Sequence, residues 1–423
     1  MNEYSVNIFC PFGYTIVICK KGGTFMIAWI ILLVVFVIVL LVRLDLYIGR
    51  KYFSTHAFER SFDQTSGDAA FYHDGEPLFD QLLTDIQQAS SSIHMMFFIV
   101  KNDKIGQRVL QALKAKAEQG VSVFLLTDRL GSYSFDQTSI QMLEKSGIQF
   151  YFLNKPRFPF FIYRLNMRNH RKITVIDGKI GYIGGFNIGD EYVGKNGRFG
   201  IWKDYHLRMT GQVVADLQHV FLNNLYRSSG IQQLQYEVFP TLEPGTLQCT
   251  TRATAGFSLE ALFLHDIQQA KNQITICTPY FIPSAPLLSA LLDARKRGVT
   301  VDIIIPMKAD HPLVKEAGFH YLKDLIAAGC LVYRFYKGFY HAKAILIDHS
   351  RCMISTANFD KRSLFFNEEV DVAIDDPAFT AHVEEKIREH MEVSELMTEE
   401  KYKQRPLLTR PIEWIGALFS YFL

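Results

Sequence analysis

The chain has 423 residues, 48% of them hydrophobic, and its 45 basic and 43 acidic side chains leave a formal net charge of +2. This length leaves room for two domains, and the composition provides for a large buried core. The six cysteines show neither paired nor metal-ligand spacing: Cys10, Cys19, Cys249, Cys277, Cys330 and Cys352. We therefore expect reduced, structural thiols, which excludes a disulfide framework and favours a cytoplasmic main domain.

The first 23 residues allow two interpretations. Lys21-Gly22-Gly23, a few codons before Met26, would be encoded by purine-rich codons that resemble a bacterial ribosome-binding sequence. Residues 1–23 are therefore either a leader that has been read as protein or a genuine N-terminal tail, and the sequence leaves both open.

An uncharged apolar run follows, from Thr24 to Val42. It is long enough to cross a bilayer, and Arg43-Leu44-Asp45 offers no small-residue cleavage site of the kind that ends a signal peptide. We expect an uncleaved transmembrane helix at residues 24–42 and a linker at 43–65.

The charges beside this run bear on its orientation. Arg43, Arg50 and Lys51 follow it, and by the positive-inside rule they place the rest of the chain on the cytoplasmic side of the cell membrane. Lys20 and Lys21, which precede the run, oppose this orientation.

The remainder of the chain contains a long internal duplication. Asp85-Ile86-Gln87-Gln88-Ala89 reappears as Asp266-Ile267-Gln268-Gln269-Ala270, and each copy runs into an apolar stretch, a helical pattern, a glycine and a β-branched run. A repeat of this length is typical of a duplicated domain and not of a solenoid. The order of elements predicts an α/β fold with two lobes, residues 66–243 and 244–396, around mostly buried sheets.

The C-terminal tail, residues 397–423, is rich in aliphatic and aromatic residues but is interrupted by charges. It is too short and too polar to span a bilayer. We expect an amphipathic helix that either lies in the membrane interface or packs on the lobes, and both alternatives stay open.

Each half carries one copy of the pattern H-x-K-x4-D, followed by an asparagine. The residues are His170, Lys172, Asp177 and Asn187 in the first copy, and His341, Lys343, Asp348 and Asn358 in the second. Two copies of so rare a pattern predict one site built from both halves. β-branched neighbours place the motif on a strand, where His170 and Lys172 point to the same side.

These side chains suit phosphoryl transfer without a metal ion or another cofactor, and we expect neither. Two ammonium groups can neutralise the non-bridging oxygens of a phosphodiester, and the carboxamides add neutral donors. One neutral imidazole can attack phosphorus while the other protonates the leaving alkoxide. Asp177 and Asp348 follow a strand, so we expect them to brace the site and not to touch the substrate.

A basic and aromatic stretch precedes the first motif, and we call five of its residues the lipid-access segment: Arg157, Phe158, Phe160, Phe161 and Arg164. Cations are attracted to anionic lipid, and aromatic rings favour the headgroup level. We expect the segment to enter the cytoplasmic leaflet and admit headgroups to the first motif. The alternatives are a solvated basic face over core aromatics, or a surface for single-stranded nucleic acid.

The two motifs with their asparagine tails resemble the phospholipase D superfamily. Trp202-Lys203-Asp204-Tyr205-His206 and Asn358-Phe359-Asp360-Lys361-Arg362-Ser363 resemble bacterial cardiolipin synthases, in the form with a single N-terminal span. The resemblance covers about residues 26–396 and implies two α/β lobes with one shared active site. It also implies the condensation of two phosphatidylglycerols into cardiolipin and glycerol. Ser355-Thr356 departs mildly from the Gly-Ser that is common in the family.

The resemblance further implies a carboxylate behind each histidine, contributed by the opposite half. By position, Asp204 would pair with His341 and Glu369 with His170, while Glu368 is the competing candidate for Glu369. Such a partner fixes the tautomer of the imidazole.

Together these features predict a membrane-anchored phosphatidyl transferase that acts on phosphatidylglycerol and anionic lipids, not on nucleic acid. They leave its protein partners unknown. A phospholipase D-type hydrolase of phospholipid or nucleic-acid phosphodiesters is one alternative, and an inactive membrane scaffold is another. The complete motifs argue against the scaffold, and the span argues against a nuclease. The sequence does not distinguish transfer to an alcohol from hydrolysis, because the choice depends on how well the site excludes water.

Overall fold

The computed structural model describes residues 7–9, 15–17, 22–195, 197–231, 238–311, 313–406 and 409–422. Contacts divide the chain into two units, Met1–Thr55 with Arg157–Tyr163, and His56–Pro156 with Arg164–Leu423. The first unit begins with a hairpin of β1 (Asn7–Phe9) and β2 (Thr15–Val17). The other residues before Gly22 lie outside the described part, so the leader hypothesis stays a prediction.

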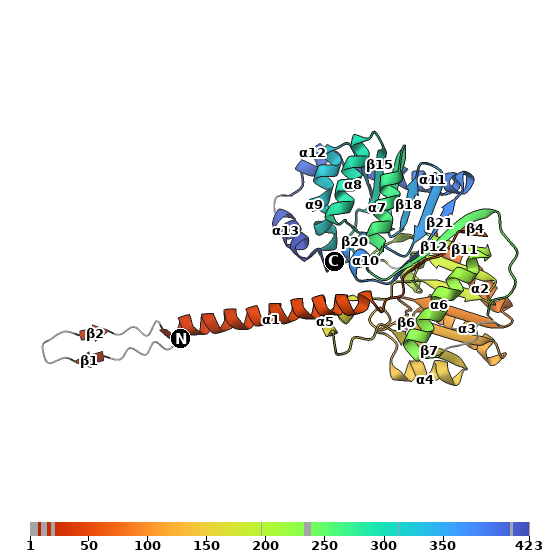
Figure 1. Cartoon of the computed structure of the whole chain (residues 1–423), viewed down its shortest axis with the longest axis horizontal. Helices are drawn as coiled ribbons and strands as arrows, with labels where there is room; N and C mark the ends of the chain where they lie inside the picture. The colour runs from red at the N-terminus through yellow and green to blue at the C-terminus, as the bar shows by residue number, and fades with distance from the viewer. Residues whose placement is uncertain are drawn as a thin grey trace. The chain divides into compact units, whose positions relative to one another are not determined.

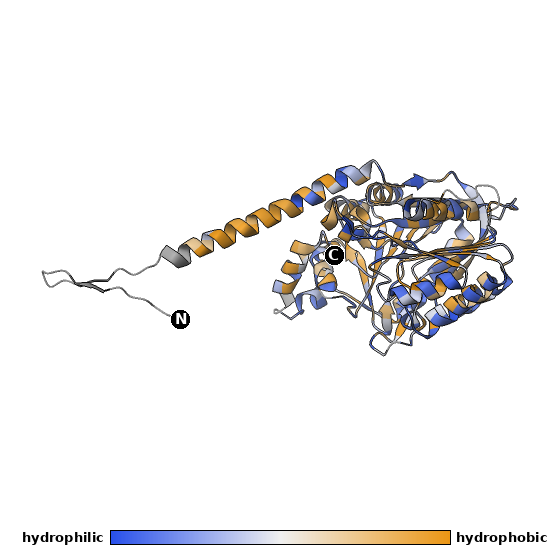
Figure 2. Ribbon diagram, turned by 90° about the horizontal axis from the view of Figure 1, so that it is seen from below, coloured by the Kyte–Doolittle hydropathy of each residue, from blue (hydrophilic) through white to orange (hydrophobic). Residues whose placement is uncertain are grey.

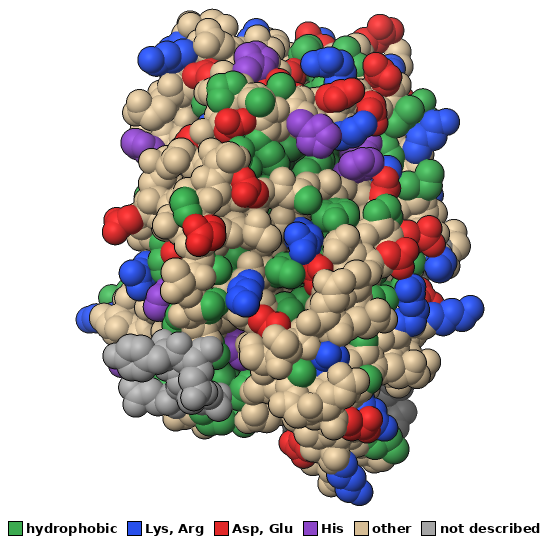
Figure 3. Space-filling view, turned by 90° about the vertical axis from the view of Figure 1, so that its right-hand side faces the viewer, with side chains coloured by type: hydrophobic (Ala, Val, Ile, Leu, Met, Phe, Trp, Pro, Cys, Tyr) green, Lys and Arg blue, Asp and Glu red, His purple; other side chains and the backbone are tan. Residues whose placement is uncertain are grey.

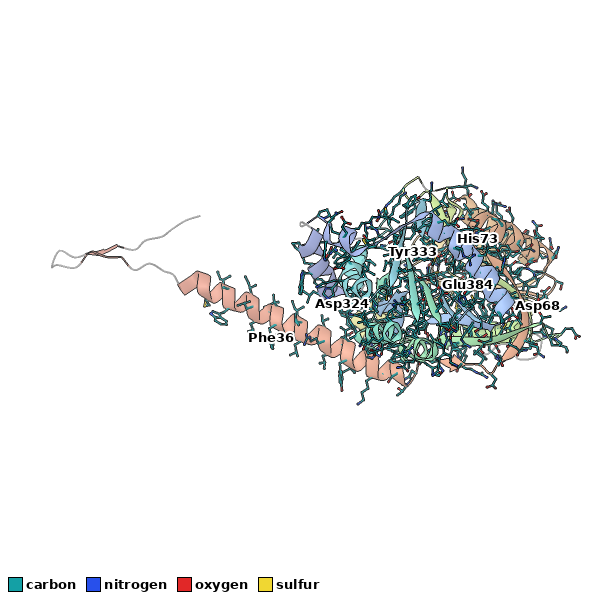
Figure 4. The ribbon with its side chains drawn as sticks, turned by 90° about the horizontal axis from the view of Figure 1, so that it is seen from above. Phe36, Asp68, His73, Asp324, Tyr333 and Glu384 are labelled. Carbon is teal, nitrogen blue, oxygen red and sulfur yellow. The ribbon has the colours of Figure 1, made fainter. Side chains whose placement is uncertain are left out.

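α1 (Gly22–Ser54) is a single helix that contains the expected anchor. Within the described residues, its stretch Met26–Ser54 is the one candidate that is long and apolar enough to cross a membrane. None of the most apolar part of this stretch is buried against the rest of the protein. Figure 2 shows the hydrophobic colour along it, and Figure 4 shows Phe36 projecting from it. Residues 43–54, which we expected to be linker, are helical, because Arg43 ends the apolar run but no proline ends the helix.

The last turns of α1 pack on the aromatic segment at residues 157–163. The ring of Phe53 stacks on that of Tyr163 with centroids 5.2 Å apart, and the ring of Tyr52 lies 5.3 Å from that of Phe160. Part of the lipid-access segment is thereby held against the end of the candidate membrane span.

A backbone contact tightens this packing. The N–H of Tyr163, in α5 (Phe161–Asn166), donates to Oδ1 of Asp45 at 2.8 Å. Gly49 permits the approach, since a Cβ atom there would lie 2.7 Å from Cβ of Tyr163. The glycine is therefore explained by the close packing of α1 against Tyr163.

In the second unit, a sheet of sixteen described strands runs through both halves of the duplication. The first half contributes the spatial order β7-β6-β5-β8-β9-β11-β4, and the second half contributes β16-β15-β13-β18-β19-β21-β12. Equivalent strands stand in the same order, so the repeat in the sequence is a repeat of structure. β4 and β12 pair antiparallel and join the two halves edge to edge, which makes one sheet where separate lobe sheets were expected.

The strands of the first half are β3 (Arg60–Ser61), β4 (Thr65–Tyr72), β5 (Ser92–Phe97), β6 (Ser122–Asp128), β7 (Ile148–Leu153), β8 (Ile173–Ile176), β9 (Ile180–Gly184), β10 (Ile201–Lys203) and β11 (His206–Gly211). Those of the second half are β12 (Leu247–Thr254), β13 (Gln273–Cys277), β14 (Phe281–Ile282), β15 (Thr300–Pro306), β16 (Leu331–Phe335), β17 (Gly338–Tyr340), β18 (Ala344–Ile347), β19 (Arg351–Ser355), β20 (Phe359–Asp360), β21 (Glu369–Asp375) and β22 (Ser394–Leu396).

Helices cover both faces of the sheet (Figure 1). α6 (Val213–Ser229) and α11 (Pro377–Glu392) share one core, to which both halves contribute. The opposite face has a separate core in each half. Its helices are α2 (Gly75–Gln88), α3 (Lys104–Glu118) and α4 (Gln137–Lys145) in the first half, and α7 (Leu259–Gln269), α8 (Ala285–Lys296) and α9 (Val314–Ala327) in the second.

The expected C-terminal tail forms α12 (Glu399–Lys403) and α13 (Thr409–Phe419). α13 lies against α9 (Figure 1), so one side of the tail packs on the second lobe. On the face that Figure 3 shows, acidic and basic side chains are interspersed, in keeping with the near balance of charges. The described cysteines, Cys249, Cys277, Cys330 and Cys352, are free and buried.

Candidate active site

His170 is positioned by backbone pairing with the other lobe. Asn169 and Glu368 form a parallel bridge, and the N–H of His170 donates to the carbonyl of Glu368 at 2.9 Å. This pairing brings Glu369 beside the imidazole, and Nδ1 of His170 lies 3.0 Å from each carboxylate oxygen. The expectation that the motif lies within a strand is wrong for His170, because β8 begins at Ile173 and the residues before it pair across the lobes.

His341 is positioned in the same manner from the opposite side. β10 and β17 pair in parallel across the lobes, with Lys203 opposite Tyr340. The N–H of the next residue, His341, donates to the carbonyl of Lys203 at 2.7 Å. Nδ1 of His341 then lies 2.5 Å from Oδ2 of Asp204. Each lobe thus supplies the carboxylate that holds the imidazole of the other lobe.

The two motif lysines are buried beside these pairs. Nζ of Lys172 donates to the carbonyl of His170 at 2.7 Å, and Nζ of Lys343 donates to the carbonyl of His341. Nζ of Lys343 also lies 2.7 Å from Nδ1 of His341 and 3.8 Å from Oδ2 of Asp204. Both ammonium groups are therefore fixed within the site by main-chain oxygens.

Burial shifts the titration of every basic group in this cluster. It lowers the pKa of His170 and of His341 to about 4, so both imidazoles are neutral at pH 7. It lowers the pKa of Lys172 to about 7 and that of Lys343 to about 8. The charge of Lys343 makes a smaller contribution in the same direction to the pKa of His170, although the two residues belong to different motifs.

The two carboxylates stay ionised in spite of their burial. Burial opposes ionisation of Glu369, but His170 and Lys172 together bring its pKa down to about 2. Burial likewise opposes ionisation of Asp204, and Lys343 and His341 lower its pKa. An ionised carboxylate accepts a hydrogen bond from Nδ1–H, which keeps the proton on Nδ1 and leaves the Nε2 lone pair of each imidazole available for chemistry.

Glu369 is held by further donors, to which the sequence assigned no role. Oγ1 of Thr356 donates to it at 2.6 Å and Oγ of Ser363 at 2.9 Å. Glu368, the competing candidate, instead accepts from Nδ2 of Asn169 at 2.7 Å and pairs with Arg227 at 2.5 Å. The two neighbouring carboxylates therefore have different partners. Glu369 contacts the imidazole of His170, and Glu368 contacts Asn169 and Arg227.

The motif aspartates brace turns. Asp177 accepts the backbone N–H groups of Ser90, Ser91 and Ser92 at 2.8–2.9 Å, and Asp348 binds the equivalent turn in the second lobe, residues 271–273. Burial opposes ionisation of Asp177, but these donors lower its pKa to about 2. Each aspartate ties the turn before a central strand to the turn after the motif strand.

The two asparagines are buried and are engaged with the protein. Oδ1 of Asn187 accepts from the N–H of Ile99 at 3.1 Å, and its Nδ2 donates to Tyr192 at 3.3 Å. Nδ2 of Asn358 donates to Asp360 at 3.0 Å. Since a carboxamide carries two N–H groups, one on each asparagine remains for a further acceptor.

Aromatic rings stand beside both imidazoles. The ring of Phe98 lies 5.1 Å from that of His170, and the ring of Trp202 lies 4.9 Å from that of His341. Phe98 was missed, because it lies in an apolar run, directly after β5, and looks like an ordinary core residue. Trp202 is part of a stretch that carried the family resemblance, but the sequence alone assigned no role to this residue.

The members of the lipid-access segment differ in exposure. Phe158 is 84% exposed, which argues against a core role, and its ring stacks on that of Phe161 at 5.5 Å. Arg157 is exposed, Phe160 and Phe161 are half-buried, and half-buried Arg164 belongs to the second unit. Among the residues that the structure describes, no group of three or more His, Cys, Asp or Glu side chains is arranged to hold a metal ion.

Known proteins of one family are similar to this chain in both halves. The family model described as cardiolipin synthase, PLD-like domain, matches residues 82–221 and 263–391. The chain is 51% identical over 394 residues to the minor cardiolipin synthase ClsB of Bacillus subtilis (strain 168), covering 93% of this chain and 99% of the relative. It is 39% identical over 359 residues to the major cardiolipin synthase ClsA of the same organism, covering 83% and 74% respectively.

A solved structure shares the fold. The phosphatidylserine synthase of Haemophilus influenzae Rd KW20 superposes with a TM-score of 0.69 at 16% identity, covering 89% of this chain and all of that chain (100%). At this identity the likeness bears on the fold alone.

Proposed function

The chain belongs to the cardiolipin synthases with a phospholipase D-like domain, and on this premise we propose that it joins two phosphatidylglycerol molecules into cardiolipin and glycerol. The observation that carries the proposal is the pair of crossed contacts, His170 with Glu369 and His341 with Asp204, around two buried lysines. Such an arrangement provides a nucleophile, a proton donor and positive charge at one point.

In the first half-reaction, Nε2 of His170 attacks the phosphorus of one phosphatidylglycerol. A phosphorus–nitrogen bond forms, and the bond to the glycerol oxygen breaks. Protonated His341 gives its proton to that oxygen, so free glycerol leaves and a phosphatidyl-histidine remains. The substrate phosphate adds negative charge beside His341, which raises the pKa of that imidazole in the complex and favours its protonated form.

In the second half-reaction, the roles reverse. Neutral His341 takes the proton from a glycerol hydroxyl of a second phosphatidylglycerol, and the oxygen attacks phosphorus. The phosphorus–nitrogen bond breaks, His170 is released, and cardiolipin forms. Lys172 and Lys343 stabilise the charge on the non-bridging oxygens in both transition states, in surroundings where burial strengthens the interaction.

Two assignments rest on other grounds than the contacts. Both imidazoles have equivalent carboxylate partners, so the contacts do not distinguish the nucleophile from the proton donor. His170 is therefore proposed as the nucleophile from the family resemblance. The cytoplasmic orientation is proposed from the positive-inside rule applied to Arg43, Arg50 and Lys51. Trapping of the phosphatidyl group on His341 in the unmodified protein would reverse the first assignment.

The function is tested by incubating the purified full chain with phosphatidylglycerol vesicles and reading the products by mass spectrometry. We expect cardiolipin and glycerol in equal amounts. His170→Ala and His341→Ala should each abolish the product, because the two imidazoles act as a unit. Phosphatidic acid in place of cardiolipin would show a hydrolase, and full activity in either variant would contradict a shared site.

A further inference from the structure

α13 (Thr409–Phe419) and the residues after it have the reverse of the polarity expected for a surface helix. The side that faces the second lobe carries Glu413, Gly416 and Ser420, which are buried. The side that faces outward carries the large apolar residues Ile412, Trp414, Ile415, Leu418 and Phe419. A helix on a globular domain normally turns its apolar stripe to the core and its polar side to water.

The inner side is fixed to the lobe by polar contacts. The guanidinium of Arg405 donates to both carboxylate oxygens of Glu413, at 3.0 and 2.9 Å. Nζ of Lys361 donates to Oγ of Ser420 at 2.9 Å. These two contacts hold the middle of α13 and the residue after its end on the lobe without use of its apolar residues.

Gly416 lets the middle of the helix lie against the backbone of α9. A Cβ atom at this position would lie 2.9 Å from the backbone nitrogen of Ala317 and 3.0 Å from the carbonyl oxygen of Leu313. The smallest residue of α13 is therefore at its closest contact with the lobe, and the outward orientation of the apolar side follows from this docking.

The outward side is strongly exposed. Trp414 is 71% exposed, Leu418 78% and Phe419 50%. Contiguous apolar surface of this kind marks a site that another apolar surface covers. Trp together with aliphatic side chains on a helix too short to span is the composition of an interfacial helix.

We propose that α13 lies in the surface of the phosphatidylglycerol-containing bilayer, with this apolar side among the lipid headgroups and upper acyl chains. The inference rests on the proposed function for its lipid. The candidate span in α1 keeps a bilayer within reach of the lobes, which favours lipid over a second copy of the chain as the occupant.

The residues after α13 contact the segment that leads from α10 to Glu369. The ring of Tyr421 lies 5.8 Å from that of Phe365 and 5.1 Å from that of Phe366. Phe365 ends α10 (Lys361–Phe365), and the chain reaches Glu369 a few residues later. The residues that follow the proposed lipid-contacting helix therefore pack on the segment that carries Glu369, the carboxylate partner of His170.

Quenching by brominated lipid tests the contact without reference to activity. Trp29 in α1 is replaced by Phe in the full chain, which leaves Trp414 and Trp202, the latter 6% exposed. In vesicles of phosphatidylglycerol brominated along its acyl chains, we expect loss of the Trp414 emission. The matched variant Trp29→Phe/Trp414→Phe reports Trp202 alone and should be unquenched.

An unquenched Trp414 would overturn the proposal. So would a Trp414 emission that depends on protein concentration and not on lipid, since a second copy would then be the occupant. Because quenching reports contact between Trp414 and the acyl chains and not the formation of product, its failure is distinct from a failure to make cardiolipin.

A second test uses activity. Leu418→Asp/Phe419→Asp should lower kcat/KM on vesicles about tenfold or more, because two apolar side chains no longer enter the bilayer. Turnover of a short-chain soluble phosphodiester should be unchanged. Met142→Asp, at a residue of α4 that is 64% exposed, is the matched control and should behave as the unmodified chain does. Equal losses on both substrates would assign the helix a purely structural role and contradict the lipid contact.

Discussion

Nδ1 of His170 lies 3.0 Å from the carboxylate of Glu369, although the two residues belong to opposite halves of the duplicated chain. The reciprocal contact joins His341 to Asp204 at 2.5 Å. Each half therefore holds an incomplete site, with an imidazole whose tautomer depends on the other half. The duplication produces a catalytic site only when the two halves share one sheet and exchange carboxylates.

Replacement of Glu369 by Gln should lower kcat by about 10²- to 10⁴-fold, because the amide no longer favours the Nδ1–H tautomer or stabilises an imidazolium. Asp204→Asn should have an effect of similar size at the other imidazole. The measurement is the initial rate of cardiolipin formation, with the melting temperature as a check of folding.

Thr356→Val is the graded comparison for this prediction. It removes the 2.6 Å hydrogen bond to Glu369 but leaves the carboxylate in place, so we expect a smaller loss of kcat than in Glu369→Gln. A Glu369→Gln variant with nearly full activity and an unchanged melting temperature would show that the contact has no part in catalysis.

The dependence of activity on pH should follow the two buried lysines. In the free protein, burial lowers the pKa of Lys172 to about 7 and that of Lys343 to about 8. A lysine with a lowered pKa loses its proton as pH rises, so kcat/KM should fall through this range. The bound phosphate favours the charged lysines and raises their pKa, so kcat should persist to higher pH.

Parallel profiles of kcat and kcat/KM from pH 5 to pH 10 test this prediction. Lys172→Arg keeps a charge that does not titrate in this range, and its residual kcat/KM should lose part of the alkaline fall. Profiles that are flat from pH 6 to pH 9 in the unmodified protein would contradict the assignment of the two lysines as phosphate-binding groups.

Asp177→Asn should destabilise the fold by about 2 kcal/mol, because the carboxylate accepts three backbone N–H groups of the turn at residues 90–92. The pKa of Asp177 is lowered to about 2 in the folded chain. Its contribution to stability is therefore present above its unfolded pKa of about 3.9 and is lost as pH falls toward 2.

Thermal unfolding at pH 7 and at pH 3, between the unfolded and the folded pKa, measures this effect. The difference in melting temperature between Asp177→Asn and the unmodified chain should be larger at pH 7. A variant that keeps its melting temperature and loses activity would instead make Asp177 a participant in the chemistry.

The sequence predicted the elements whose signals are local. The duplicated pattern of apolar runs and glycines predicted the repeated strand order, and the positions of Asp177 and Asp348 after a strand predicted turns that brace the site. Contacts between the halves left no local signal. The bridge between Asn169 and Glu368 replaces the strand pairing expected at His170, and the pairing of β4 with β12 merges the two lobe sheets.

Side chains whose role depends on such long-range pairing were also missed. Phe98 belongs to a segment that looks like ordinary core, and Thr356 was noted only as a departure from the family pattern. Only the fold brings them to His170 and Glu369. α1 extends past the predicted span because a charge ends hydrophobicity but not helical structure. Glu369 itself was expected from family resemblance, since no spacing in the chain distinguishes it from Glu368.

The lipid-access segment should act at the membrane surface and not within the catalytic pocket. Phe158 is 84% exposed and stacks on Phe161, in the unit that also contains α1. Phe158→Ser/Phe161→Ser should therefore reduce turnover on phosphatidylglycerol vesicles while sparing a short-chain soluble phosphodiester. Arg157→Gln should flatten the dependence on anionic lipid and on salt, because a cation near the surface is worth about 1 kcal/mol of attraction.

Tyr133→Ser provides the matched control, since Tyr133 is an aromatic residue of the first lobe that is 80% exposed and lies outside the segment. Its vesicle activity should equal that of the unmodified chain. Equal loss of activity on vesicles and on the soluble substrate, at unchanged melting temperature, would place Phe158 and Phe161 in the catalytic pocket. A sharp fall in melting temperature would make them part of the packing around α1, and the lipid-access hypothesis would then be wrong.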